Sequence, residues 1–162
     1  SGRIVGEGER VTEVNGVQRF LFTGGDKPIY LAESDIENVI TAKAAIFAAM
    51  NILLKRLDLD FDDIDRYFIA GAFGNYIDVD NARAIGLLPS VEKSKIQFVG
   101  NTSMRGAKIC ALYREAFNEV AAIRRRTTYY DLMGAHDYVE EFQKALFLPH
   151  TDIEMFAVKG GY

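Results

Sequence analysis

The residues best suited to chemistry in this sequence are glycines that directly follow two apolar segments. Phe68-Ile69-Ala70 runs into Gly71, with Gly74 close behind, and Phe98-Val99 runs into Gly100. In open α/β sheets, ligands bind just beyond the carboxyl ends of strands, where glycine lets the backbone approach a ring or a phosphate. Two such ends side by side would make a crevice of nucleotide size. Glycines at strand ends are also ordinary residues of tight turns, and the pattern alone leaves both interpretations open.

Single side chains offer fewer candidates. Lys43 lies among alanines in the middle of a predicted helix. It is either a surface lysine whose stem lies along apolar neighbours, or a group beside the glycine loop that contacts a nucleotide or an acidic neighbour. Cys110 is predicted to be a small core residue. His136 is predicted to lie on the surface at the start of a helix, and His150 to form hydrogen bonds within a turn.

The common catalytic motifs are missing from the sequence. It holds no Gly-x-x-x-x-Gly-Lys-Ser/Thr loop, and Gly71-Ala72-Phe73-Gly74 does not complete a Gly-x-Gly-x-x-Gly pattern. One cysteine forms no internal disulfide and holds no iron–sulfur cluster, and two histidines do not favour a multi-histidine metal site. The acidic stretch 58–65 departs from a calcium loop, because its sixth position is Asp63 instead of glycine and its twelfth is Ile69 instead of glutamate.

The elements that position these residues begin with a β-rich third. Asn15-Gly16 between strands at 11–14 and 17–22 predicts a hairpin, since a type I′ turn needs positive φ at both central residues. A third strand is predicted at 29–31. The pattern Ser34-Asp35-Ile36-Glu37 then predicts a capping box that opens a helix ending near Leu57.

Alternating strands and helices follow. The patterns predict buried strands at 66–70 and 95–99, a short helix at 79–85 closed by Gly86, and one long helix from Gly100-Asn101-Thr102-Ser103 to about Arg125. An edge strand at 127–132 and a helix at 138–146 complete the chain. The predicted fold class is α/β, a mixed β-sheet flanked by helices, in a single domain over 1–162.

Composition narrows the classes of function. The chain has 162 residues, 49% of them hydrophobic and 26% charged, with a formal net charge of −4. An acidic balance argues against nonspecific binding of nucleic acid. No apolar run approaches the roughly 20 residues of a membrane-spanning helix, so we expect no membrane partner. The single cysteine, which forms no internal disulfide, favours a reducing, cytoplasmic location. The chain begins with Ser1 instead of Met, which suggests a piece excised from a longer protein.

Five ordered motifs resemble one known family. They are Asp35-Ile36-Glu37-Asn38 with Ala42-Lys43-Ala44-Ala45-Ile46, Ile69-Ala70-Gly71-Ala72-Phe73-Gly74-Asn75-Tyr76-Ile77-Asp78, Ile85-Gly86-Leu87-Leu88-Pro89, Gly100-Asn101-Thr102-Ser103, and Ala145-Leu146-Phe147-Leu148-Pro149-His150-Thr151-Asp152. Over about residues 1–157 the chain resembles the C-terminal part of the reductive activators of corrinoid proteins. Those are ferredoxin-linked ATPases that return cob(II)amide to cob(I)amide in methyl transfer. Their large domain belongs to the actin, Hsp70 and sugar-kinase superfamily.

The resemblance implies that this chain is the adenosine-side half of an ATPase domain. The cofactor-binding residues it implies are Gly71, Ala72, Phe73, Gly74, Asn75, Gly100, Asn101, Thr102 and Lys43. Relatives commonly have a second glycine where this chain has Ala72. The resemblance further implies ATP, with magnesium and both phosphate motifs outside the chain, and a [2Fe-2S] cluster in an N-terminal part of the parent. The implied partners are a corrinoid protein and a second copy in a homodimer, and the chain alone would show little or no ATPase activity.

Two other classes of function remain open. One is a partner-binding or dimerisation module without nucleotide, in which the hairpin around Asn15 and the tail 147–156 would form interfaces. The other is a Rossmann-like enzyme domain, which needs an acidic ribose-binding residue about 20 residues beyond the glycines. Glu92 lies near that spacing, although no predicted strand end presents it.

Overall fold

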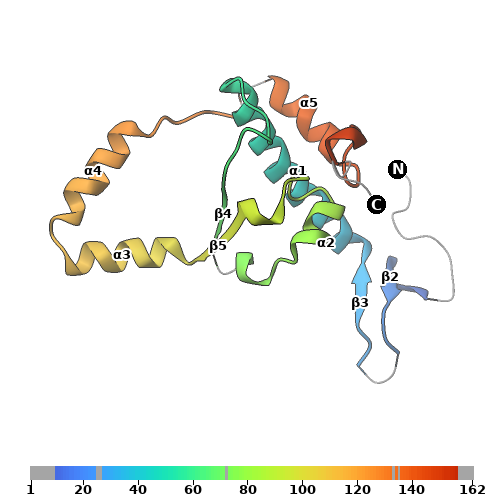
Figure 1. Ribbon diagram of the computed structural model, residues 1–162. Coiled ribbons are helices and arrows are strands. Elements are labelled where there is room, and N and C mark those ends of the chain that lie inside the picture. Colours follow the sequence, from blue (N-terminus) through green and yellow to red (C-terminus); the bar gives the residue numbers. More distant parts are fainter. Residues whose placement is uncertain (1–9, 25–26, 72, 133, 135, 157–162) are drawn as a thin grey trace.

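The structure, a computed structural model, describes residues 10–24, 27–71, 73–132, 134 and 136–156. Within them a three-stranded antiparallel sheet, a long central helix and a two-stranded parallel sheet follow in chain order, with further helices after each strand of the second sheet (Figure 1). The α/β fold class is confirmed. The strands that we expected in one mixed sheet lie in two separate sheets, ordered β1-β2-β3 and β4-β5.

The antiparallel sheet confirms the predicted hairpin. Strands β1 (Val11–Val14) and β2 (Val17–Leu21) pair so that Val14 lies opposite Val17, and β3 (Tyr30–Ala32) pairs with the other edge of β2. Asn15 and Gly16 have φ values of 54° and 77°. Both central residues of the turn therefore adopt the left-handed conformation that Asn and Gly tolerate best.

Helix α1 (Glu33–Arg56) begins before the position that the sequence pattern indicated. Its N-cap is Ala32, and the Asp35 carboxylate accepts a hydrogen bond from the Ala32 backbone N–H at 2.9 Å. The predicted capping box from Ser34 to Glu37 is therefore wrong, because both residues already lie inside the helix. The acidic residue three places after the N-cap satisfies a backbone donor without any hydroxyl at the cap itself.

The parallel sheet holds strands β4 (Tyr67–Ala70) and β5 (Ile96–Gly100). Between them lie the 3₁₀ turn η1 (Phe73–Tyr76), helix α2 (Val79–Ala84) and the 3₁₀ turn η2 (Lys93–Lys95). We expected both strands to be buried, which is wrong. Phe68 is 59% exposed and its partner Gln97 is also exposed, so the face that these two residues share is open. Phe98 pairs with Ile69 on the opposite face and is 43% exposed.

The predicted long helix after β5 is two helices, α3 (Thr102–Leu112) and α4 (Ala116–Arg126). Figure 1 shows them extending away from the body formed by α1 and its neighbours. The chain leaves α3 where Tyr113 takes an extended conformation, with φ −129° and ψ 110°. The prediction failed because the apolar three- and four-residue spacing continues across the break. The expected edge strand at 127–132 is also wrong, since no described residue of that segment forms a strand.

The core lies where helix α5 (His136–Ala145) packs along α1 (Figure 1). Ala44, Phe47 and Ala145 are at most 1% exposed at its centre. Partly buried side chains surround them, namely Met50, Phe61, Phe142, Leu146, Met155 and Phe156, the last two from the 3₁₀ turn η3 (Ile153–Phe156). By length and composition alone α1 is apolar enough to cross a membrane, which the apolar runs of the sequence did not indicate. In this fold it is the core helix against which α5 packs.

Candidate functional site

The two glycine-terminated strand ends lie side by side. Strands β4 and β5 are parallel, so their carboxyl ends meet at the same edge, and Gly100 lies opposite Ala70 after a register irregularity. The Gly71 backbone N–H donates a hydrogen bond to the Gly100 carbonyl at 2.8 Å. The juxtaposition that the sequence predicted is therefore present in the fold.

Both of these glycines have backbones that other residues rarely adopt. The φ values are 97° at Gly71 and 66° at Gly100. Apart from its chain neighbours, a Cβ atom added at either position would meet no atom of the described residues within 4 Å. The missing side chains thus leave the backbone bare on an open side, where a flat ring or a phosphate could approach.

The loop after β4 turns back on its own strand. Its backbone forms η1, and a Cβ on Gly74 would lie 2.7 Å from the Ile69 side chain, so any side chain at position 74 would force Ile69 to shift. Ala72 lies outside the described residues, as do the side chains of Phe73 and Asn75. The nucleotide-binding roles predicted for these three residues stay predictions.

The loop after β5 opens helix α3. The Asn101 side chain accepts a hydrogen bond from the Met104 backbone N–H at 2.9 Å, which confirms the predicted polar cap. Thr102 is the first residue of the helix and is exposed. The cap uses one acceptor of Asn101, and the first turn of α3 still offers backbone donors with the positive end of a helix dipole.

Lys43 is buried, so the surface-lysine interpretation is wrong. Its side chain is 1% exposed, and its ammonium donates hydrogen bonds to the backbone carbonyls of Phe147 and of Pro149, the latter at 2.8 Å. Burial lowers the pKa of Lys43 to about 8. Because its ammonium already serves two carbonyls, we leave Lys43 out of the nucleotide-contacting residues proposed below.

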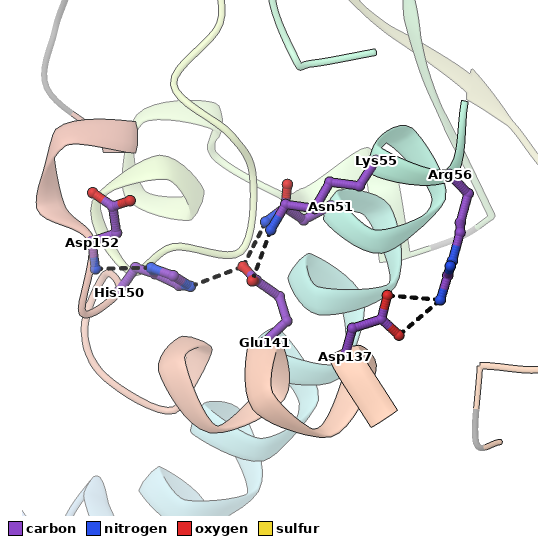
Figure 2. A network of polar contacts seen from close by, with 7 residues as sticks. All are labelled: Asn51, Lys55, Arg56, Asp137, Glu141, His150 and Asp152. Carbon is purple, nitrogen blue, oxygen red and sulfur yellow. Dashed lines mark hydrogen bonds and ion pairs between the residues drawn. The ribbon is translucent and has the colours of Figure 1, made fainter. Parts of the chain in front are cut away.

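A buried polar cluster centred on Glu141 was not predicted (Figure 2). Glu141 lies on α5, is 3% exposed, and accepts hydrogen bonds from Asn51 at 2.5 Å and Lys55 at 3.2 Å, both on α1. Burial alone would raise the pKa of Glu141, but the bonds from Asn51 and Lys55 outweigh it and hold that pKa below its usual value. The available signal was its position on the apolar side of α5, three residues after Tyr138 and four before Ala145.

His150 joins this cluster to the C-terminal segment. Its Nδ1 accepts a hydrogen bond from the Asp152 backbone N–H at 3.0 Å, which confirms the predicted hydrogen bonding within a turn. Its Nε2 lies 3.3 Å from Glu141, without hydrogen-bond geometry (Figure 2). Its ring lies 5.3 Å from that of Phe47. Burial lowers the pKa of His150, against the opposing effect of Glu141. The cluster holds α1, α5 and residues 150–152 together.

Metal-binding groups do not gather in the part of the chain that the structure describes. No three His, Cys, Asp or Glu side chains there are placed to hold an ion. Asp60 and Asp63 instead close a turn, since each side chain accepts hydrogen bonds from backbone N–H groups of the same stretch. Cys110 is half-buried on α3, whose residues form no core, so its predicted core role is wrong. A single thiol does not fit an iron–sulfur cluster.

Comparison with known families places this chain among the ASKHA domains. Residues 1–159 match the family described as the C-terminal domain of RACo, the ASKHA domain. The chain belongs to that family, which confirms the resemblance drawn from the five motifs.

The similar proteins are named for the activation or reduction of corrinoid proteins. The chain is 36% identical over 126 residues to the corrinoid activation enzyme RamQ of Eubacterium limosum, covering 75% of this chain and 21% of that protein. It is 33% identical over 107 residues to the [Co(II) methylated amine-specific corrinoid protein] reductase of Methanosarcina barkeri, covering 66% of this chain and 20% of that one. A solved reductive activator for corrinoid, iron–sulfur protein matches with a TM-score of 0.83 and 41% identity, over 92% of this chain and 24% of that chain. The chain therefore spans about a fifth to a quarter of these relatives.

Proposed function

We propose that this chain is the part of an ATP-dependent reductive activator of a corrinoid protein that holds the adenosine side of the nucleotide. The observation that carries the proposal is the hydrogen bond between Gly71 and Gly100, which fixes two bare backbone ends at one sheet edge. The names of the relatives support the corrinoid activation. The activity belongs to the longer protein, and this chain contributes binding.

Each part of the proposed site has a separate task. The backbone at Gly71 and Gly100 would lie against the purine and ribose, because neither glycine has a side chain of its own. The free amides at the start of α3 would face the negative end of the ligand. Magnesium and the attacking water would be held by residues outside this chain, as would the [2Fe-2S] cluster, which its one cysteine does not fit. ATP would act by favouring a closed arrangement of the parent, from which the corrinoid protein accepts an electron.

The test uses three glycines whose φ angles are all positive. Gly71→Ala and Gly100→Ala add a methyl group at the proposed site, whereas Gly16→Ala adds one at the distant hairpin, where φ is also positive and the space is also open. All three should lose a similar amount of stability, about 1 kcal/mol. Titration with ADP, followed by NMR, should show binding weakened at least tenfold by the first two variants only.

Two results would overturn the proposal. One is an unchanged amide spectrum of the unmodified chain at millimolar ADP or ATP. The other is an equal loss of affinity in all three glycine variants, since that loss would then follow stability instead of position.

A further inference from the structure

The segment 147–150 lies between helix α1 and the chain that leaves helix α2. On one side the buried Lys43 of α1 donates hydrogen bonds to the carbonyls of Phe147 and Pro149. On the other side Gly86, just after α2, packs so tightly that an added Cβ would lie 2.1 Å from the Pro149 carbonyl oxygen. The Pro149 carbonyl therefore accepts a hydrogen bond from Lys43 and also limits the position of the chain that leaves α2.

Helix α2 links this contact to the glycine loop. It has six residues, and its end is closed by bonds from Ile85 N–H to the Asn81 carbonyl at 3.1 Å and from Gly86 N–H to the Arg83 carbonyl at 3.0 Å. Its start is capped by Asp78, whose side chain accepts from Asn81 N–H at 2.8 Å. The Ile77 N–H donates a hydrogen bond to the Gly74 carbonyl at 3.4 Å. Only three residues separate the Asp78 cap from Gly74, so the start of α2 is tied closely to the glycine loop.

We infer that Lys43 is a positioning residue for the glycine loop: it fixes the Pro149 carbonyl against Gly86 and thereby sets where α2 and residues 74–78 lie. The inference rests on the proposed function only in giving that loop a nucleotide to hold. Lys43 then influences binding without touching the ligand. The residue after the segment supports the same arrangement, because the Thr151 N–H donates a hydrogen bond to the Lys144 carbonyl at 3.1 Å and so ties the end of the segment to α5.

The experiment perturbs the Pro149 carbonyl from both sides. Lys43→Met keeps the length of the side chain but removes its donors, and Gly86→Ala places a methyl group against the carbonyl. Ile52→Ala is the matched control, because Ile52 lies on α1, is also 1% exposed, and has no polar group to offer. Two quantities are measured on the 162-residue chain: amide hydrogen exchange at residues 76–85, and ADP affinity.

We expect Lys43→Met and Gly86→Ala to speed exchange at residues 76–85 at least tenfold relative to Ile52→Ala, and to weaken ADP binding at least fivefold. If all three variants change exchange and affinity equally, Lys43 has only a structural role and the inference fails. It also fails if Lys43→Met leaves exchange at 76–85 unchanged. Should the unmodified chain bind no ADP while the exchange pattern appears as expected, the positioning role stands and the proposed function falls.

Discussion

At the scale of single residues, buried charge is the most informative feature of this chain. Lys43 and Glu141 are both almost fully buried, yet each has distant hydrogen-bond partners. Lys43 donates to two backbone carbonyls of the segment after α5, and Glu141 accepts from two side chains of α1. Burying an ionisable group without such partners costs several kcal/mol, so these residues specify which surfaces must meet. Sequence reasoning singled out Lys43 because of its alanine neighbours, but it could not find carbonyls more than 100 positions away.

The buried lysine predicts an unusual alkaline pH dependence. Its pKa of about 8 in the folded chain lies below the ordinary 10.5, so between these values the unfolded chain binds the proton that the folded chain has released. Stability should therefore rise as pH increases above 8, by up to about 1.4 kcal/mol per unit. Burial raises the pKa of Tyr67 from 10 to about 12, and this opposes the rise only above pH 10.

Urea unfolding at pH 8, 9 and 10 checks this sign. Lys43→Met should abolish the rise, because it removes the titrating group. Lys108→Met, at an exposed lysine of α3, should retain it. A stability that stays level or falls between pH 8 and 10 in the unmodified chain contradicts the prediction.

At the scale of elements, the helices divide into two kinds. Helices α1 and α5 share a core in which the Phe47 ring lies 5.4 Å from Phe61 and 5.1 Å from Phe156. Helices α3 and α4 contain no buried residue among those described, although both carry apolar side chains at helical spacing. Leu112 is 65% exposed and Ile123 62% exposed. The amphipathic pattern predicted helices correctly, but it did not reveal whether their apolar faces are covered.

This division predicts very different costs for similar truncations. Phe47→Ala should destabilise the chain by about 3–5 kcal/mol, because it removes a ring from the centre of the core. Leu112→Ala and Ile123→Ala should change the free energy of unfolding by no more than about 0.5 kcal/mol each, because little is lost where little is buried. Urea unfolding followed by circular dichroism measures all three. A loss above 2 kcal/mol for Leu112→Ala would mean that α3 packs against the body in solution.

At the scale of the whole molecule, our proposal assigns nucleotide binding to this chain and catalysis to other parts of the longer protein. The paired strand ends offer backbone for an adenosine, and the described residues gather no cluster of carboxylates or histidines that could hold magnesium. The chain spans 24% of the solved relative, which leaves room in the longer proteins for the residues that handle the phosphates. Cleavage of the terminal phosphate requires that the charge on the transferred phosphoryl group is neutralised and that the attacking water is positioned.

The separation predicts that the 162-residue chain does not hydrolyse ATP although it binds adenine nucleotides. Release of inorganic phosphate, measured at saturating ATP and magnesium, should not exceed the background without protein. A Gly100→Ala preparation is the control, because activity present equally in both samples comes from a contaminant. Turnover that disappears with Gly100→Ala would contradict the prediction and place the catalytic groups within this chain.

Local patterns in the sequence determined most of the secondary structure and the family. The Asn-Gly hairpin, both parallel strands, α2 with its closing Gly86, and the Asn101 cap depend on neighbours within a few residues, so they could be predicted. The tertiary structure alone decided that Gly71 bonds to Gly100, that Lys43 donates a hydrogen bond to the Pro149 carbonyl, and that α3 and α4 leave their apolar faces exposed. Those outcomes depend on contacts between residues that lie 29 to more than 100 positions apart, and periodicity carries no information about such distant partners.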